Sequence, residues 1–395
     1  MSRVSLRFAF VAGALATGAL AFAAEPAADA SASGKPQATK RSHAIIRLLN
    51  SRVAGSPFAY EEAAKIVRED ADKVNARGEP VHPLQRFVIA LFSNDRDAPA
   101  AARLSPSKRA AYLDSARAKI TQLAERKNNA LAWYLLSIEH NDMDLLRRAA
   151  DGGNVQALNA LGTIDLMNAL NDSSMSTNEV LVTMSRSFAR FKQASDRGDA
   201  NGLYNLGMCY LNGYGCERNE NLAFECFRTT AEGGHPEAIN NLGGFYRDGI
   251  VVRRNVAKAT ECFARSAKLG NSYGELNYAL ALQRGEGVEK NEKKAFELLS
   301  RAAESGNVEA MNAYGMCYYS GSGVKKDAST AFAWFMRAAS FGFPQAMENL
   351  AACYEHGEGV EKDMRSSTLW KVRARANSGD RNAAAWLMQN GHSLR

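Results

Sequence analysis

The stretch EAMNAYGMCYYSGSGVKKDASTAFAWFMRAASFG, residues 309–342, decides the fold of this chain. Small and apolar residues recur in it every three or four positions, first before Gly321 and again after Asp327. This pattern predicts two helices joined by a short loop. The same residue types return 36 residues earlier and later along the chain. A fixed period of this length is typical of a solenoid, in which each hairpin buries its apolar face only against the next hairpin.

Three columns of residues, each repeated at this period, mark the ends of the predicted helices. A glycine after a helix supplies the left-handed conformation that favours a helix end, and a short polar side chain before a helix can cap its free N–H groups. The glycines are Gly213, Gly249, Gly285, Gly321 and Gly357 after the first helix, and Gly198, Gly234, Gly270, Gly306 and Gly342 after the second. The polar column before the second helix is Asn219, Asn255, Asn291, Asp327 and Asp363. Each unit is therefore predicted to be a pair of antiparallel helices.

The order Ala-x3-Leu-Gly-x2-Tyr-x2-Gly-x-Gly-Val-x2-Asp-x3-Ala, closed by Ala-Ala-x2-Gly, resembles the Sel-one-like repeat (SLR), a longer relative of the tetratricopeptide repeat (TPR). The resemblance covers Ala200 to Gly379 as five regular repeats and is degenerate on either side. It implies an all-α fold, a right-handed α/α superhelix (solenoid) whose first helices line the concave side and bind other proteins. The resemblance does not name the partner.

The start of the chain has the features of a secretory signal peptide. Arg3 and Arg7 precede the apolar run Phe8–Ala21, and Ala21-Phe22-Ala23 is a small-residue cleavage pattern. The run is short for the alternative, an uncleaved membrane anchor. We therefore expect residues 1–23 to be removed, with no membrane span afterwards. The mature protein is expected in a periplasm or the extracellular space, or in a secretory lumen if the source is eukaryotic.

The rest of the chain divides by composition and period. Residues 24–41 are predicted to be a disordered leader, and residues 42–129 a divergent N-terminal helical module that caps the array. Residues 130–199 are interpreted as degenerate repeats, with about nine extra residues around 171–177 that we expect to form a loop. That loop contains the sequon Asn171-Asp172-Ser173, which has a meaning only in a eukaryotic source. Residues 380–395 are predicted to close the array with a capping helix.

No motif for a cofactor, a metal or catalysis stands out in the sequence. The histidines are scattered without ligand spacing, no Gly-x-Ser-x-Gly elbow occurs, and the Gly-x-Gly loops lack the Lys-Ser/Thr of a phosphate-binding loop. The excess positive charge lies before residue 130 without the aromatic and basic interleaving of a nucleic-acid surface. We therefore expect no cofactor, no metal and no nucleic-acid partner.

Six cysteines in an exported protein raise the question of disulfide bridges. Equivalent positions in neighbouring repeats are too far apart to be bridged. Within one repeat, Cys209 with Cys226, or Cys216 with one of them, remains a candidate pair. The alternative is that all six are buried thiols that act as small apolar residues. The sequence leaves both alternatives open.

Ten residues form the predicted partner-binding set. Two positions of the first helix that should be polar are apolar in several repeats, and an asparagine column runs beside them. The asparagines would hydrogen-bond to an extended peptide while the apolar side chains contact its side chains. Alternatively, the asparagines hold a neighbouring loop and adjacent helices cover the apolar pair. The set is Tyr204, Asn205, Met208, Asn241, Leu276, Asn277, Leu280, Asn312, Met316 and Asn349.

The sequence therefore predicts an exported, non-enzymatic scaffold that binds another protein or peptide through its concave groove, as an adaptor or regulator. By the resemblance, an envelope sensor or a cell-wall enzyme would be a suitable partner. The alternative is a cell-wall-related enzyme or a binder of small β-lactam-like molecules. That alternative would need a clustered Ser, Lys and Glu set in a closed pocket. The oligomeric state is not predicted.

Overall fold

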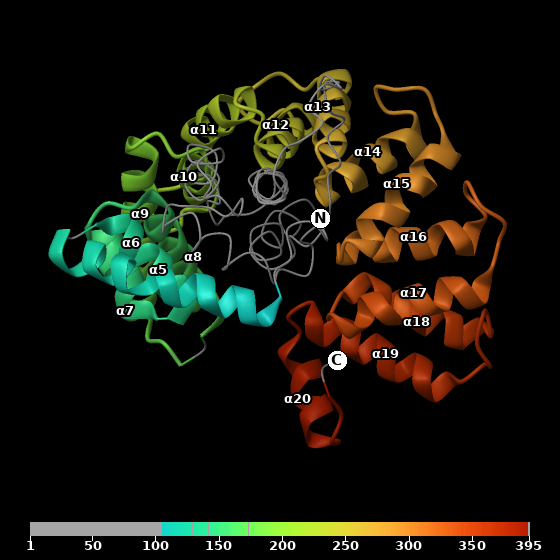
Figure 1. The fold of residues 1–395 in the computed structure, drawn as a ribbon. Helices are drawn as coiled ribbons and strands as arrows, with labels where there is room; N and C mark the ends of the chain where they lie inside the picture. Colours follow the sequence, from blue (N-terminus) through green and yellow to red (C-terminus); the bar gives the residue numbers. More distant parts are fainter. Residues whose placement is uncertain (1–104, 128, 141, 173, 394–395) are drawn as a thin grey trace. The chain divides into compact units, whose positions relative to one another are not determined.

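The computed structural model describes residues 105–127, 129–140, 142–172 and 174–393, which form sixteen α-helices and no strand (Figure 1). The all-α fold of repeated hairpins that the period predicts is confirmed. The predicted signal peptide, the leader and residues 42–104 of the N-terminal module lie outside the described residues. The chain divides into two compact units, residues 1–238 and residues 239–395.

The described helices follow one another as antiparallel pairs. The first unit contains α5 (Pro106–Lys127), α6 (Ala130–His140), α7 (Met143–Asp151), α8 (Val155–Asn171), α9 (Thr177–Asp196), α10 (Ala200–Asn212) and α11 (Glu220–Glu232). Helix α12 (Pro236–Asp248) begins at the end of that unit and lies mainly in the second. The second unit continues with α13 (Val256–Lys268), α14 (Ser272–Arg284), α15 (Glu292–Glu304), α16 (Val308–Ser320), α17 (Ala328–Ser340), α18 (Pro344–His356), α19 (Met364–Asn377) and α20 (Arg381–Gln389).

The repeat formed by α16 and α17 shows why these residues make a hairpin. Gly321 ends α16 with φ 83° and donates its N–H to the carbonyl of Cys317 at 2.8 Å. Asp327 then caps α17 by accepting the N–H of Thr330 at 3.1 Å. At Gly315 a Cβ would lie 2.8 Å from the ring of Phe335, so glycine is needed for the two helices to pack. The predicted polar column caps all five second helices from α11 to α19.

The second glycine of each Gly-x-Gly loop fixes the distance between neighbouring repeats. At Gly287 a Cβ would lie 2.8 Å from the carbonyl oxygen of Val256, the first residue of α13. Gly323 and Gly359 approach the first residues of α15 and α17 in the same way. The exception is the loop after α12, where Val251 takes this place with φ 65°. A β-branched residue in the left-handed region is strained.

The extra residues near position 171 extend helices, so the expectation that they form a loop is wrong. Helix α8 has 17 residues and α9 has 20, whereas each helix of the next repeat has 13. Ser176 and Glu179 form a capping box that starts α9 directly after a short turn. The stretch from Val155 to Asp196 contains one glycine and no proline, so nothing in it interrupts helical structure.

The core of the second unit is the stripe that the period predicts. Ala346, Leu350 and Ala351 of α18 are fully buried. Lys371 of α19, which takes an apolar position of the repeat, is half-exposed and pairs with Glu355 at 2.5 Å. The cap helix α20 follows, with Leu387 buried. Among the described helices, none is long and apolar enough to cross a membrane.

Candidate partner-binding site

The first helices of the second unit expose one continuous strip of side chains, which we call the first-helix face. Residues at spacings of four and then three lie on the same side of a helix. On α14, α16 and α18 these positions repeat every 36 residues. They are Tyr273, Asn277 and Leu280 on α14; Glu309, Ala313 and Met316 on α16; and Gln345, Asn349 and Ala352 on α18. All nine are half-buried or exposed.

Asparagine pairs connect the helices across this face. Asn277 donates through Nδ2 to Oδ1 of Asn240 on α12 at 2.9 Å, and Asn349 donates in the same way to Asn312 on α16 at 2.8 Å. Asn277 and Asn349 therefore connect neighbouring first helices, whereas the alternative interpretation had the asparagines hold a neighbouring loop. No described residue donates a hydrogen bond to the side-chain carbonyl oxygen of Asn277 or of Asn349.

The apolar members of the predicted set divide between core and surface. Leu276 is 4% exposed and belongs to the core of the second unit, and Met208 is fully buried in the first. The expectation that these two side chains are exposed is wrong, because helices on both sides cover a residue in a solenoid. Met316 is 39% exposed and Leu280 is partly buried against the core edge. Leu280 and Met316 are therefore the apolar members that a partner can reach.

Glu309 gives the first-helix face an acidic centre. Its half-buried side chain makes no ion pair or hydrogen bond with any described residue. Burial raises the pKa of Glu309, and the nearby Glu309 carboxylate adds to the effect of burial in raising the pKa of the Tyr273 hydroxyl. By contrast Glu275 on α14, which is buried, pairs with Arg301 at 2.9 Å. A partly desolvated carboxylate without a cation favours a positively charged ligand.

The members of the set in the first unit are placed differently. The ring of Tyr204 stacks on the imidazole of His235 with centroids 4.8 Å apart, and Nε2 of His235 lies 3.1 Å from Oδ1 of Asn201. Asn205 is buried, and its Nδ2 has no hydrogen-bond partner among the described residues. Asn241, at the start of the second unit, is buried as well. Asn205 and Asn241 are therefore not exposed as the prediction required, whereas Tyr204 is half-buried.

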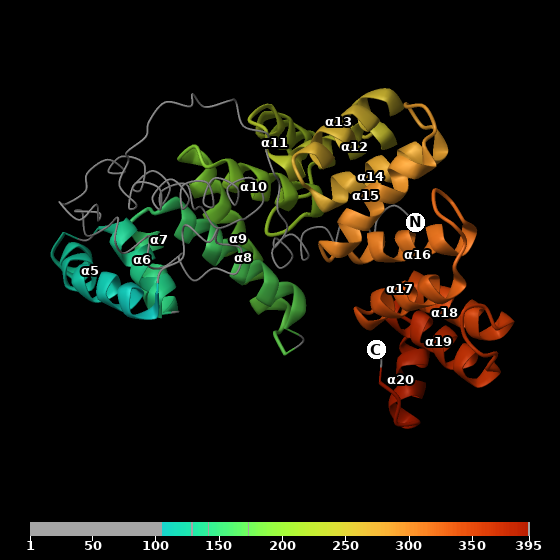
Figure 2. The ribbon, with the colours of Figure 1, turned by 45° about the vertical axis from the view of Figure 1, so that its right-hand side comes forward.

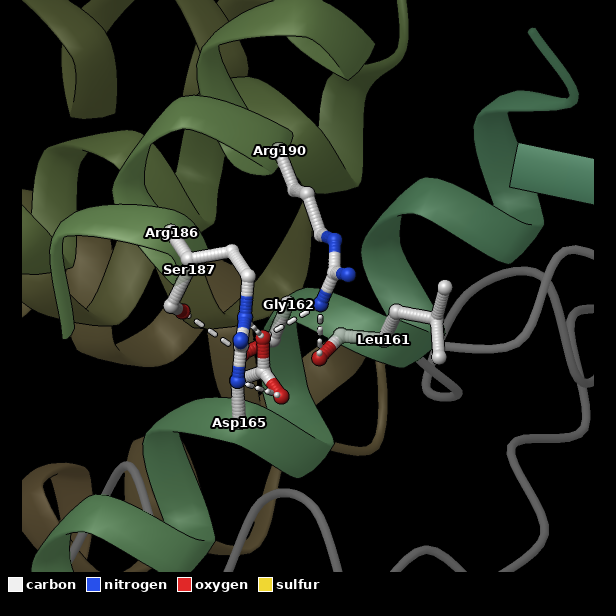
Figure 3. A network of polar contacts seen from close by, with 6 residues as sticks. All are labelled: Leu161, Gly162, Asp165, Arg186, Ser187 and Arg190. Carbon is white, nitrogen blue, oxygen red and sulfur yellow. Dashed lines mark hydrogen bonds and ion pairs between the residues drawn. The ribbon is translucent and has the colours of Figure 1, made fainter. Parts of the chain in front are cut away.

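Sequence reasoning missed a buried ion-pair network between α8 and α9 (Figure 3). Asp165 accepts from Nε of Arg186 at 2.6 Å and also from Nη1 of Arg190, which reaches the carbonyl of Leu161 at 3.4 Å. The side chains of Asp165 and Arg190 are 13% and 20% exposed. Burial lowers the pKa of Arg190, whereas the hydrogen bond that Arg186 donates to Asp165 raises the pKa of Arg186.

A comparison of equivalent positions in neighbouring repeats could have predicted this network. Gly162 contacts Phe191 as Gly207 contacts Phe227, so the two repeats can be aligned residue by residue. In that alignment Asp165 and Arg190 take the places of Tyr210 and Cys226. Two opposite charges at positions that are aromatic or apolar in the later repeats indicate a pair.

The six cysteines lie in the described part of the chain and form no disulfide bridge there. All six cysteines are free thiols, and burial raises the pKa of Cys226 to about 11, which makes it a poor nucleophile. No group of three metal-binding side chains occurs among the described residues.

The comparison with protein families decides the nature of the array. The Sel1 repeat family matches residues 200–235, 236–271, 272–307, 308–340 and 344–370. The chain carries five Sel1 repeats. Sel1 repeats form a helical scaffold that is typical of protein–protein interaction. No curated protein matches the chain.

Similar solved structures include a protein with an SLR fold and a Sel1 repeat protein. A protective antigen of uropathogenic Escherichia coli with an SLR fold is 26% identical with a TM-score of 0.47, over 64% of this chain and 53% of the antigen. This chain therefore spans about half the length of that antigen. A Sel1 repeat protein from Oxalobacter formigenes is 25% identical with a TM-score of 0.48, over 64% of this chain and 94% of its own. An immunity protein of Pseudomonas aeruginosa, PA5088, is 15% identical with a TM-score of 0.41, over 56% of this chain and 82% of the immunity protein.

Proposed function

We propose that this Sel1 repeat protein is an adaptor or regulator that holds an extended segment of a partner protein on the first-helix face of its second unit. The observation that carries the proposal is the unpaired Glu309 on the same face of α16 as the exposed Met316. An apolar side chain of the partner would contact Leu280 and Met316, and a lysine or arginine would pair with Glu309. The side-chain carbonyl oxygens of Asn277 and Asn349 would accept hydrogen bonds from backbone N–H groups of the partner segment.

The proposal includes export, because the signal-peptide pattern supports a partner outside the cytosol. An envelope sensor or a cell-wall enzyme with an accessible basic segment would meet these requirements. The alternative, an enzyme or a small-molecule binder, gains no support from the cavity of about 490 Å³ at the start of α11. Its lining residues, Arg218, Asn219, Glu220 and Asn221, include no nucleophile.

The experiment is affinity capture from an extract of the native source, with mass spectrometry and chemical crosslinking to locate the contact. Met316→Glu is the test variant, and Met364→Glu is the matched control because Met364 on α19 is 50% exposed outside the first-helix face. Leu276 is not a suitable test, since a charge there would enter the core. Crosslinks at α14 and α16 that only Met316→Glu abolishes would support the proposal. A partner retained equally by both variants would exclude this face.

A further inference from the structure

The α8–α9 hairpin of the first unit projects beyond the neighbouring repeat. In the second unit, a Gly-x-Gly loop contacts the first residue of the preceding second helix, as Gly287 contacts Val256. The corresponding glycine after α10 is Gly215, and it contacts Met184, the eighth residue of α9. Seven residues of α9, Thr177–Thr183, therefore lie beyond the point where the next repeat packs. At 1.5 Å per residue this is a projection of about 10 Å.

The lengths of the helices lead to the same result. Helix α9 has 20 residues against 13 in α11, which is the same excess of seven. Figure 2 shows the turn of this hairpin pointing away from α6, α7 and α10. The projecting part is thus a helical extension of the repeat rather than a loop inserted between two helices.

Two adjacent apolar side chains are exposed on this projection. Leu181 is 57% exposed and Val182 is 61% exposed. The inner side of the same turn is packed, since Thr183 is buried against the hairpin. The exposed pair is therefore not a frayed end but one side of a packed helix.

The charged residues that precede this pair in α9 and its turn are acidic, whereas Arg186, one turn after Val182, is paired with Asp165 at 2.6 Å. Between Asn168 and Thr183 the only charged residues are Asp172 and Glu179, and the nearest basic residue after them is Arg186. Asp172 accepts from the hydroxyl of Ser174 at 2.6 Å and from its N–H at 2.9 Å, and Glu179 accepts from the hydroxyl and the N–H of Ser176, both at 2.7 Å. These hydrogen bonds lower the pKa of both carboxyls, so both are charged at neutral and at mildly acidic pH.

Hydrogen bonds order the described residues of the tip. The capping box of Ser176 and Glu179 starts α9, and Asp172 closes the turn onto Ser174. A contact that is already ordered loses little conformational entropy on binding.

We propose that Leu181 and Val182, with Asp172 and Glu179, form a second docking surface, whose partner is a protein helix with an apolar stripe bordered by lysine or arginine. The apolar pair would insert into the stripe, and the two carboxylates would pair with the cations at its border. The surface lies in the first unit and is independent of the first-helix face, so either proposal stands if the other fails.

The probe for this docking surface is a pair of synthetic 18-residue amphipathic helices with the same leucine positions, one with lysine and one with glutamate on its polar side. Each peptide is titrated by fluorescence anisotropy into the full mature chain at low and at physiological salt. We expect the lysine peptide to bind at least tenfold more tightly than the glutamate peptide. We also expect higher salt to weaken its binding.

The variants distinguish the tip from other acidic surfaces. Leu181→Ser with Val182→Ser should reduce the affinity at least fivefold, and Asp172→Asn with Glu179→Gln at least threefold. Leu222→Ser on α11, where the native side chain is 44% exposed, should change it less than twofold. Circular dichroism confirms that each variant is folded.

Three results would overturn the proposal. The tip variants and Leu222→Ser could bind the lysine peptide equally, or the two peptides could bind alike. The third result would be a dimer of the unliganded chain in sedimentation that Leu181→Ser with Val182→Ser abolishes. In that case the partner of the tip would be a second copy of this chain.

Discussion

Asn277 donates a hydrogen bond through Nδ2 to Oδ1 of Asn240, 2.9 Å away in the preceding repeat. Asn349 and Asn312 repeat this pair two repeats later. The same positions between α14 and α16 are Leu276 and Ala313, so both amides are missing together. On α14, α16 and α18, an asparagine therefore occurs in this column only where the preceding repeat supplies an asparagine as its partner.

Breaking one of these amide pairs should cost a measurable part of the stability of the second unit. Asn349→Ala and Asn312→Ala should each lower the free energy of unfolding by about 1 kcal/mol, the usual net contribution of such a bond. The double variant should cost clearly less than the sum, because the second substitution removes no further bond. Denaturant unfolding of all three variants checks this, and strictly additive losses would show that the pair does not form.

The buried network in the first unit predicts unequal effects of its members. Asp165→Ala leaves the largely buried Arg190 without its carboxylate, which should destabilise the unit by about 3 kcal/mol. Arg186 is 52% exposed, so Arg186→Ala should cost less than about 1 kcal/mol. The double variant Asp165→Tyr with Arg190→Cys restores the residues of the next repeat and should recover most of the loss. Thermal unfolding measures all three, and equal losses for Asp165→Ala and Arg186→Ala would be inconsistent with this network.

The strained Val251 predicts a stabilising substitution. A left-handed conformation costs an L-residue about 1–2 kcal/mol, whereas glycine adopts it freely at an entropic cost of about 0.5–1 kcal/mol. Val251→Gly should therefore raise the free energy of unfolding by about 0.5–1 kcal/mol. Val288→Gly is the control, because Val288 has no positive φ and packs against the core, so this substitution should destabilise. A loss of stability in Val251→Gly would mean that its side chain contributes more than the strain costs.

Glu309 predicts a specific dependence of stability on pH. Because burial raises its folded-state pKa, its contribution to folding is complete below the unfolded-state pKa and is lost as the pH rises through the folded-state value. Glu309→Gln should therefore unfold at the same denaturant concentration as the wild type near pH 4 and at a higher concentration at pH 7. The exposed Glu304→Gln should change little at either pH. A wild type more stable than Glu309→Gln at pH 7 would indicate a cation partner within the chain.

The sequence predicts the repeats well because each hairpin depends on local rules. The glycine at position 321 fixes where α16 ends, and the cap at position 327 fixes where α17 begins. The 36-residue period then gives the positions of the other hairpins. The helical extension of α9 was missed because an insertion was equated with a loop, although Ser176 and Glu179 already form the capping-box pattern.

The candidate site was only partly predictable for a different reason. A single helix viewed alone places Leu276 on its outer side, but the adjacent repeats enclose that position in the core. The pairing of Asn277 with Asn240 and the isolation of Glu309 also depend on contacts 36 or more residues apart. Such contacts between repeats follow from the stacking geometry, which the pattern within one repeat does not contain.

The central claim is that a partner binds on the first-helix face, and one titration tests it most directly. The protein captured with the wild type is titrated by calorimetry against the wild type, Met316→Glu and Met364→Glu at the same salt concentration. The account predicts at least tenfold weaker binding to Met316→Glu, about 1.4 kcal/mol, and less than a twofold change for Met364→Glu. Equal affinities for the two methionine variants would contradict it.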